Sequence, residues 1–75
     1  MRYRLSTEIV EFEIKQEPLG MWDIYVEGMP TLSFTTPEEA AISVFSKSAG
    51  YADWDNSDSN HTAPKNLSGW EKYND

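Results

Sequence analysis

Hydrophobic and polar residues alternate along three segments of the first half of the chain, residues 8–15, 21–27 and 31–35. A period of two is typical of a β-strand with one buried face, because successive side chains leave opposite sides of the strand. The two breaks, residues 16–20 and 28–30, each contain Gly and Pro and therefore predict turns. The pattern predicts a three-stranded antiparallel β-meander.

The length of the first turn predicts how these strands pair. With residues 16–20 as the turn, the apolar pairs of one face are Ile14 with Trp22, Phe12 with Ile24 and Val10 with Val26. The second turn then pairs Val26 with Leu32 and Ile24 with Phe34. On the other face the same register predicts Glu13 opposite Asp23, Glu11 opposite Tyr25 and Ile9 opposite Glu27. Like charges directly opposite each other destabilise a sheet, so this face is expected to be acidic at some expense of stability.

A helix is expected directly after the third strand. Thr36 has the character of an N-cap, Pro37 stands at the first helical position, and Glu38 and Glu39 favour the positive end of the helix dipole. The stripe expected to cover the apolar face of the sheet is Ala40, Ala41, Val44 and Phe45. Gly50 is a suitable stop. The fold class is therefore α+β, with a βββα core over residues 8–50.

The remaining residues, 51–75, read as a polar loop and a C-terminal extension of the same single domain, residues 1–75. Two conformations are open for the end of the chain. One is a short helix from about residue 66 or 68, and the other is an extended tail whose aromatic residues dock on the sheet. Trp54, Trp70 and Tyr73 are either lids of the core, the favoured interpretation, or candidate hydrophobic anchors for a partner.

Composition excludes several kinds of chemistry. The 75 residues carry a net charge of −7 and no cysteine, so disulfides, thiolate zinc sites and thiol catalysis are excluded. No apolar run approaches the roughly 18 residues of a membrane-spanning helix, and no secretory signal is visible, so a cytoplasmic protein is expected. A calcium loop starting at Asp53 fails, because Asp58 and Pro64 replace its required Gly and Glu. The single histidine, His61, falls in a loop. We expect no enzyme activity, no metal and no cofactor.

Charge predicts the kind of partner. The six Lys and Arg residues are scattered, which argues against direct binding of nucleic acid. The candidate partner-binding residues on the strands are Glu11, Glu13, Asp23, Tyr25 and Glu27, and a second acidic patch comprises Asp53, Asp55 and Asp58. Such a surface can occupy the basic groove of a protein or complex that handles nucleic acid.

In size and charge the chain is similar to small acidic inhibitors of phages and mobile elements, including many anti-CRISPR and anti-restriction proteins. The similarity is one of class, since no family motif is present. It implies a non-enzymatic inhibitor that mimics nucleic acid. Two alternatives stay open. The acidic face is only a solvated surface, or the protein is a small accessory subunit or adaptor that binds through its sheet edge or its C-terminal aromatics. The edge at residues 31–35 leaves both a monomer and a homodimer open.

Overall fold

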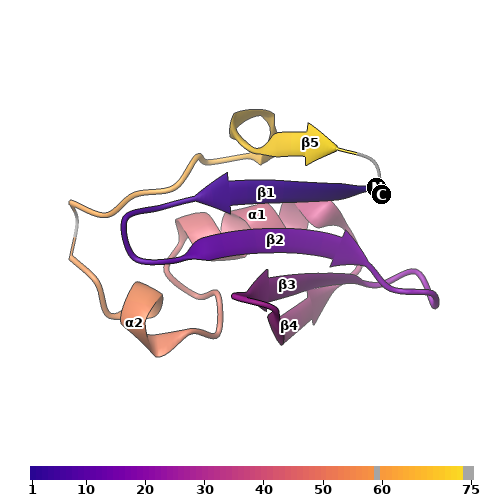
Figure 1. Ribbon diagram of the computed structural model, residues 1–75, viewed down its shortest axis with the longest axis horizontal. Helices are drawn as coiled ribbons and strands as arrows, with labels where there is room; N and C mark the ends of the chain where they lie inside the picture. Colours follow the sequence, from indigo (N-terminus) through magenta and orange to yellow (C-terminus); the bar gives the residue numbers. More distant parts are fainter. Residues whose placement is uncertain (59, 74–75) are drawn as a thin grey trace.

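Five strands form one antiparallel sheet in the computed structural model, which describes residues 1–58 and 60–73. The strands are β1 (Arg2–Ser6), β2 (Glu11–Gln16), β3 (Trp22–Val26), β4 (Met29–Phe34) and β5 (Glu71–Tyr73). They lie in the order β4-β3-β2-β1-β5. Helix α1 (Pro37–Phe45) lies against one face of this sheet, and the short helix α2 (Ala52–Asp55) lies at one end of the molecule (Figure 1). A single 3₁₀ turn, η1 (Leu67–Gly69), precedes β5.

The α+β class is confirmed, but the sheet has more strands than the sequence predicted. In β1, Tyr3 and Leu5 alternate with charged or polar residues, and Tyr3 is buried. The last strand, β5, pairs with β1, so that Arg2 lies opposite Tyr73 and Arg4 opposite Glu71. Of the two conformations left open for the C-terminus, the extended one matches, and among the described residues from 66 to 73 the helical turn is η1. Residues 2–6 and 71–73, near the two ends of the chain, therefore belong to the same sheet.

The predicted register between β2 and β3 is wrong by two residues. Ile14 lies opposite Ile24 and Phe12 opposite Val26, because β2 extends to Gln16 and the turn spans one residue later than expected. The Glu17 N–H donates to the Met21 carbonyl across the turn, at 2.8 Å. A shift of two leaves every side chain on its predicted face but changes its partner.

This shift removes the predicted clash of like charges. Asp23 lies opposite Lys15, and Glu13 lies opposite Tyr25. Glu11 is no longer opposite Tyr25, and its facing residue on β1 is Ser6. The pair of opposed carboxylates, Glu13 and Asp23, was therefore an incorrect prediction. The observed pairing of opposite charges is the more stable one.

The turn between β3 and β4 is also tighter than predicted. It consists of Glu27 and Gly28, whose φ angles of 51° and 86° are those of a two-residue hairpin turn with both residues left-handed. The pairs that follow are Val26 with Met29 and, after an irregularity, Ile24 with Leu32 and Trp22 with Phe34. The expected pairs Val26–Leu32 and Ile24–Phe34 are therefore wrong.

Helix α1 begins as predicted. The Glu39 N–H donates to the Thr36 hydroxyl at 3.2 Å, and both Thr35 and Thr36 donate to the Glu39 carboxylate. Ala40, Ala41 and Val44 are buried against the sheet, whereas Phe45, expected on the same stripe, is 43% exposed. The stripe that covers the sheet is thus made mainly of small side chains, which allow the helix to approach closely.

Residues after Gly50 complete this core. Trp54 is fully buried, packs edge-on against Phe12 with ring centroids 5.3 Å apart, and donates from its indole N–H to the Val44 carbonyl. Trp70 is also buried, with its ring 6.4 Å from that of Phe12. Both tryptophans are therefore core residues, and the segment from residue 51 onward contributes to the same core as the strands. Among the described residues, no helix is long and apolar enough to cross a membrane.

Candidate functional site

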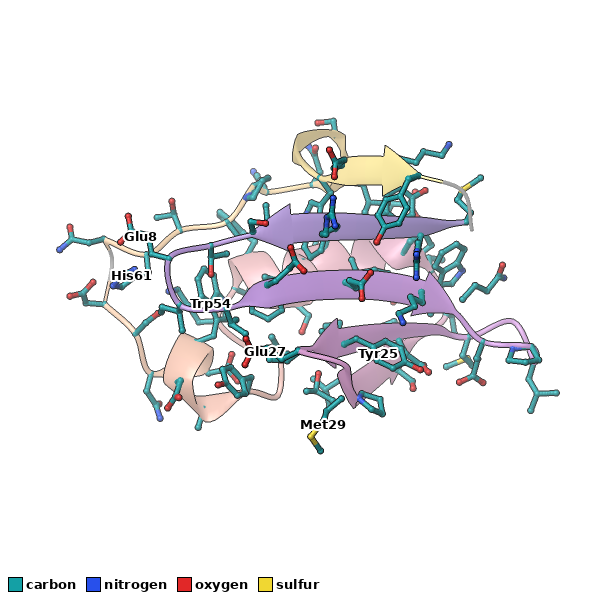
Figure 2. The ribbon with its side chains drawn as sticks, viewed as in Figure 1. Glu8, Tyr25, Glu27, Met29, Trp54 and His61 are labelled. Atoms are coloured by element: carbon teal, nitrogen blue, oxygen red, sulfur yellow. The ribbon has the colours of Figure 1, made fainter. Side chains whose placement is uncertain are left out.

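The face of the sheet that points away from α1, here called the outer face, carries most of the strand residues predicted to bind a partner. No helix of the described residues covers it, and Tyr25 lies on it (Figure 2). The strand pairings assign to this face four carboxylates and three cationic side chains: Glu11, Glu13, Asp23 and Glu71, with Arg2, Arg4 and Lys15. The outer face is therefore close to neutral, not the acidic grid that the sequence predicted.

The cations of the outer face are placed between the carboxylates. Arg4 Nη2 lies 2.7 Å from Glu71 Oε1 and its Nε lies 3.8 Å from Glu11 Oε2. Arg2 Nη1 and Lys15 Nζ lie 3.9 Å and 3.8 Å from the two oxygens of Glu13. Because β1 inserts its arginines between β2 and β5, each of these glutamates has a basic neighbour.

Two tyrosines hold these cations in position. The Tyr73 hydroxyl donates to Glu13 Oε2 at 2.5 Å, and the guanidinium carbons of Arg2 and Arg4 lie 4.6 Å and 5.3 Å from the Tyr73 ring centroid. This hydrogen bond to Glu13, together with burial and the Glu13 charge, raises the pKa of the Tyr73 phenol. Lys15 Nζ lies 4.4 Å from the centre of the Tyr25 ring. Cation–π contacts of this kind reinforce the charge pairing.

Asp23 has a structural role. Only 8% of the residue is exposed, and Oδ1 accepts a hydrogen bond from the Ser33 hydroxyl at 2.6 Å. Partial burial raises the pKa of the neighbouring Glu17 carboxyl, and the hydrogen bond to Asp23 and its negative charge act in the same direction. Asp23 is thus enclosed by Lys15, Ser33 and Glu17, and little of it is accessible to a partner.

Among the described residues, four exposed carboxylates without a Lys or Arg partner lie at one end of the molecule, which measures 34 × 20 × 19 Å. The loop between β1 and β2, the β3–β4 turn, and α2 with the loop after it meet there (Figure 1). We call this the acidic end, and its exposed carboxylates are Glu8, Glu27, Asp53 and Asp58. In the part of the chain that the structure describes, none of the four forms an ion pair with Lys or Arg. The sequence grouped Glu27 with the partner-binding candidates on the strands, but in the structure it lies at the acidic end with Asp53 and Asp58.

Tyr51 links two parts of the acidic end. Its hydroxyl donates to Asp53 Oδ2 at 3.4 Å. Partial burial, then the charge and hydrogen bond of Asp53, and finally the charge of Glu27 raise the pKa of this phenol. Asp55, the third predicted aspartate, turns inward and accepts from the backbone N–H groups of Ala49 and Gly50 at 2.8 Å and 3.0 Å. Asp55 is therefore a structural residue.

Lys47 contacts residues of this end, and its charge is engaged internally. Nζ lies 3.9 Å from the centre of the Trp54 ring and donates to the Ser57 hydroxyl and the His61 carbonyl. These contacts tie the loop after α2 to the end of α1. The sequence offered no sign of this arrangement, because the partners are 10 and 14 residues away along an irregular segment.

A cavity of about 360 Å³ opens at the acidic end. It is lined by Ser6, Thr7, Glu8, Trp54, Asn60, His61 and Thr62. His61 Nδ1 lies 3.8 Å from Glu8 Oε2 across it, and the two side chains lie near each other in Figure 2. A second hollow of about 500 Å³ borders the Arg4–Glu71 ion pair on the outer face. No group of three or more potential metal ligands occurs among the described residues.

Sequence reasoning missed Arg2, Arg4 and Glu8 as members of these surfaces. The two arginines could have been found, because residues 2–6 alternate as a strand does and a strand beside β2 brings basic residues to its glutamates. Comparisons with protein-family models, curated proteins and solved structures found no significant match to the chain. Function therefore has to be inferred from these surfaces alone.

Proposed function

We propose that the protein is a non-enzymatic acidic module that binds the basic nucleic-acid-binding surface of a partner and inhibits it by mimicking nucleic acid. The observation that carries this proposal is the separation of charge. The outer face pairs its charges internally, whereas Glu8, Glu27, Asp53 and Asp58 have no Lys or Arg partner in the described chain. The proposed contact surface is therefore the acidic end.

Unpaired charge favours binding for a physical reason. A carboxylate already held by arginine must lose that contact before it can bind another base, whereas these four exposed carboxylates have no contact with Lys or Arg of the described chain to lose. Neighbouring like charges also add their fields and speed the encounter with a basic surface. The sheet-face candidates, Glu11 and Glu13, then contribute at the border of the interface and not at its centre.

The test is a pull-down from bacterial lysate in low and in high salt, followed by mass spectrometry. The test variant is Glu27→Lys with Asp53→Lys, and the matched control is Glu17→Lys with Glu38→Lys, which changes the net charge equally. We expect the wild type and the control to retain one nucleic-acid-binding protein in low salt and to release it in high salt. The test variant should lose it, and added nucleic acid should compete with the wild type for the captured protein.

Retention by the test variant, or binding that is insensitive to both salt and nucleic acid, would exclude the mimic.

The second candidate is an adaptor that uses the edge strand β4, where Met29 is 69% and Leu32 39% exposed. Pro30 lacks an N–H donor and the pairing is irregular there, which limits strand addition at this edge. Met29→Lys should abolish binding of this second kind. The buried Trp54 and Trp70 are unavailable as anchors.

A further inference from the structure

The cavity at the acidic end has preformed walls. On one side, the Thr7 hydroxyl accepts from the N–H groups of Ile9 and Val10 at 3.2 Å and 3.0 Å and donates to the Val10 carbonyl at 2.7 Å. On the other side, the Asp58 carboxylate accepts from the Asn60 N–H at 3.0 Å. Lys47 additionally holds the His61 carbonyl. Because both walls are already ordered, a ligand does not have to order them on binding.

Oxygen atoms dominate the chemistry of this cavity. Glu8 provides a carboxylate whose side chain is 85% exposed, and its Oε2 lies 3.8 Å from His61 Nδ1. The side chains of Asn60 and Thr62 line the cavity, and neither makes a hydrogen bond within the described chain. The free acceptors therefore consist of a carboxylate, an amide and a hydroxyl on neighbouring parts of the wall. The ammonium of Lys47, which is turned onto Trp54, is not among the lining groups.

A guanidinium group matches this set best. It presents five N–H donors in one plane, has no acceptor, and pairs strongly with a carboxylate, whereas an anion would face the charge of Glu8. The volume, about 360 Å³, lies at the lower end of the roughly 300–1,000 Å³ range of small-ligand pockets, which suits one long side chain. We infer that this cavity is a socket for an arginine side chain of the basic partner, with Glu8 as its counter-charge. The inference rests on the proposed function.

The experiment needs no partner protein. N-acetyl-arginine methylamide, whose caps leave only the side-chain charge, is titrated into the ¹⁵N-labelled full chain. We expect saturable shifts of the amide signals at Ser6, Thr7 and Thr62. The uncharged citrulline analogue should bind at least about tenfold more weakly, since it lacks the charge-assisted hydrogen bonds. Glu8→Gln should weaken arginine binding by a similar factor, whereas the matched Glu38→Gln, on α1, should not.

Three results would overturn the socket. They are equal binding of the citrulline analogue, equal weakening by Glu8→Gln and Glu38→Gln, or inorganic phosphate shifting the same signals in place of arginine.

Failure of the socket and failure of the proposed function are distinguishable. If the Glu27 and Asp53 reversals abolish partner capture while the arginine compound does not bind, the socket is wrong and the mimic stands. If the compound binds at the cavity but no basic partner is captured, the cavity is an arginine-binding site and the mimic is wrong.

Discussion

The hydroxyl of Tyr73 donates a hydrogen bond to the Glu13 carboxylate, with Oη and Oε2 2.5 Å apart and β1 lying between the strands that carry them. The two residues are 60 positions apart in the chain. Their contact joins the last strand to the middle of the sheet on its outer face. It also adds a hydrogen bond to the Glu13 carboxylate, whose other neighbours are Arg2 and Lys15.

Replacing Tyr73 by Phe removes this hydrogen bond and keeps the ring under the arginines. We expect a loss of about 1 kcal/mol in the free energy of unfolding, because water screens this half-exposed site. Tyr25→Phe is the matched control, since the Tyr25 hydroxyl makes no hydrogen bond within the described chain. Urea denaturation of both variants measures the difference. Equal losses would show that the Tyr73 hydroxyl contributes nothing specific.

Glu17 and Asp23 make stability depend on pH. The folded protein has a raised pKa for the Glu17 carboxyl, from burial and from Asp23. The stabilising contribution of protonated Glu17 is therefore fully present below its unfolded pKa of about 4.5 and is lost as the pH rises through the higher folded pKa. Glu17→Gln keeps an amide donor toward Asp23 at every pH. The variant should be more stable than the wild type at pH 7 and lose this advantage near pH 4.

Thermal unfolding at a series of pH values tests the direction of this pH dependence. Glu38→Gln is the control, because Glu38 interacts favourably with the N-terminus of α1 and its removal should reduce stability at pH 7. A Glu17→Gln protein that melts at or below the wild-type temperature at pH 7 would contradict the repulsion between Glu17 and Asp23.

Gly50 is required both for its backbone conformation and for space. Its φ is +83°, and an added Cβ would lie 2.9 Å from Leu32 Cγ. Gly28 has nearly the same φ, +86°, but open space around it. We expect Gly28→Ala to lower the free energy of unfolding by about 1 kcal/mol, and Gly50→Ala by at least about 1 kcal/mol more. Chemical denaturation of the two variants separates the backbone effect from the steric effect. Equal losses of the free energy of unfolding would show that the contact with Leu32 contributes nothing.

Lys47 is expected to stabilise the loop that forms one wall of the cavity. Lys47→Met preserves the aliphatic stem but removes the cation–π contact with Trp54 and the hydrogen bonds to Ser57 and the His61 carbonyl. The expected loss is roughly 1–2 kcal/mol. Hydrogen exchange should accelerate at the amides of Ser57 and His61. Lys65→Met, an exposed site with the same change of charge, should leave both quantities unchanged.

Much of the fold was predictable from local sequence. Strands β2, β3 and β4 follow from the alternation of apolar residues, and α1 begins at Pro37 after the Thr36 cap, as expected. These features depend on residues within a few positions of one another, so the sequence displays them directly. The two-residue turn at Glu27 was less visible, because glutamate is not a residue that favours a left-handed conformation.

The candidate site was predictable only as a list of acidic side chains. Which of them are paired depends on contacts such as Arg4 with Glu71, 67 residues apart. The sequence predicted Glu27 and Asp53 as members of separate patches, and the tight β3–β4 turn and α2 bring both to the acidic end. Local patterns contain no information on such distances, so the position of the unpaired charge could not be deduced in advance.

The sequence by itself determined the α+β class, three of the strands, the start of the helix and the apolar face of the sheet. The tertiary structure decided the register, the addition of strands β1 and β5 to the sheet, and the neutrality of the outer face. A shift of two residues leaves every apolar side chain on the buried face, so the apolar pattern cannot distinguish the two registers. The register with Lys15 opposite Asp23 is the one with complementary charges. Strand β5 is only three residues long and is stable only when paired with β1, a contact that exists once the chain has folded.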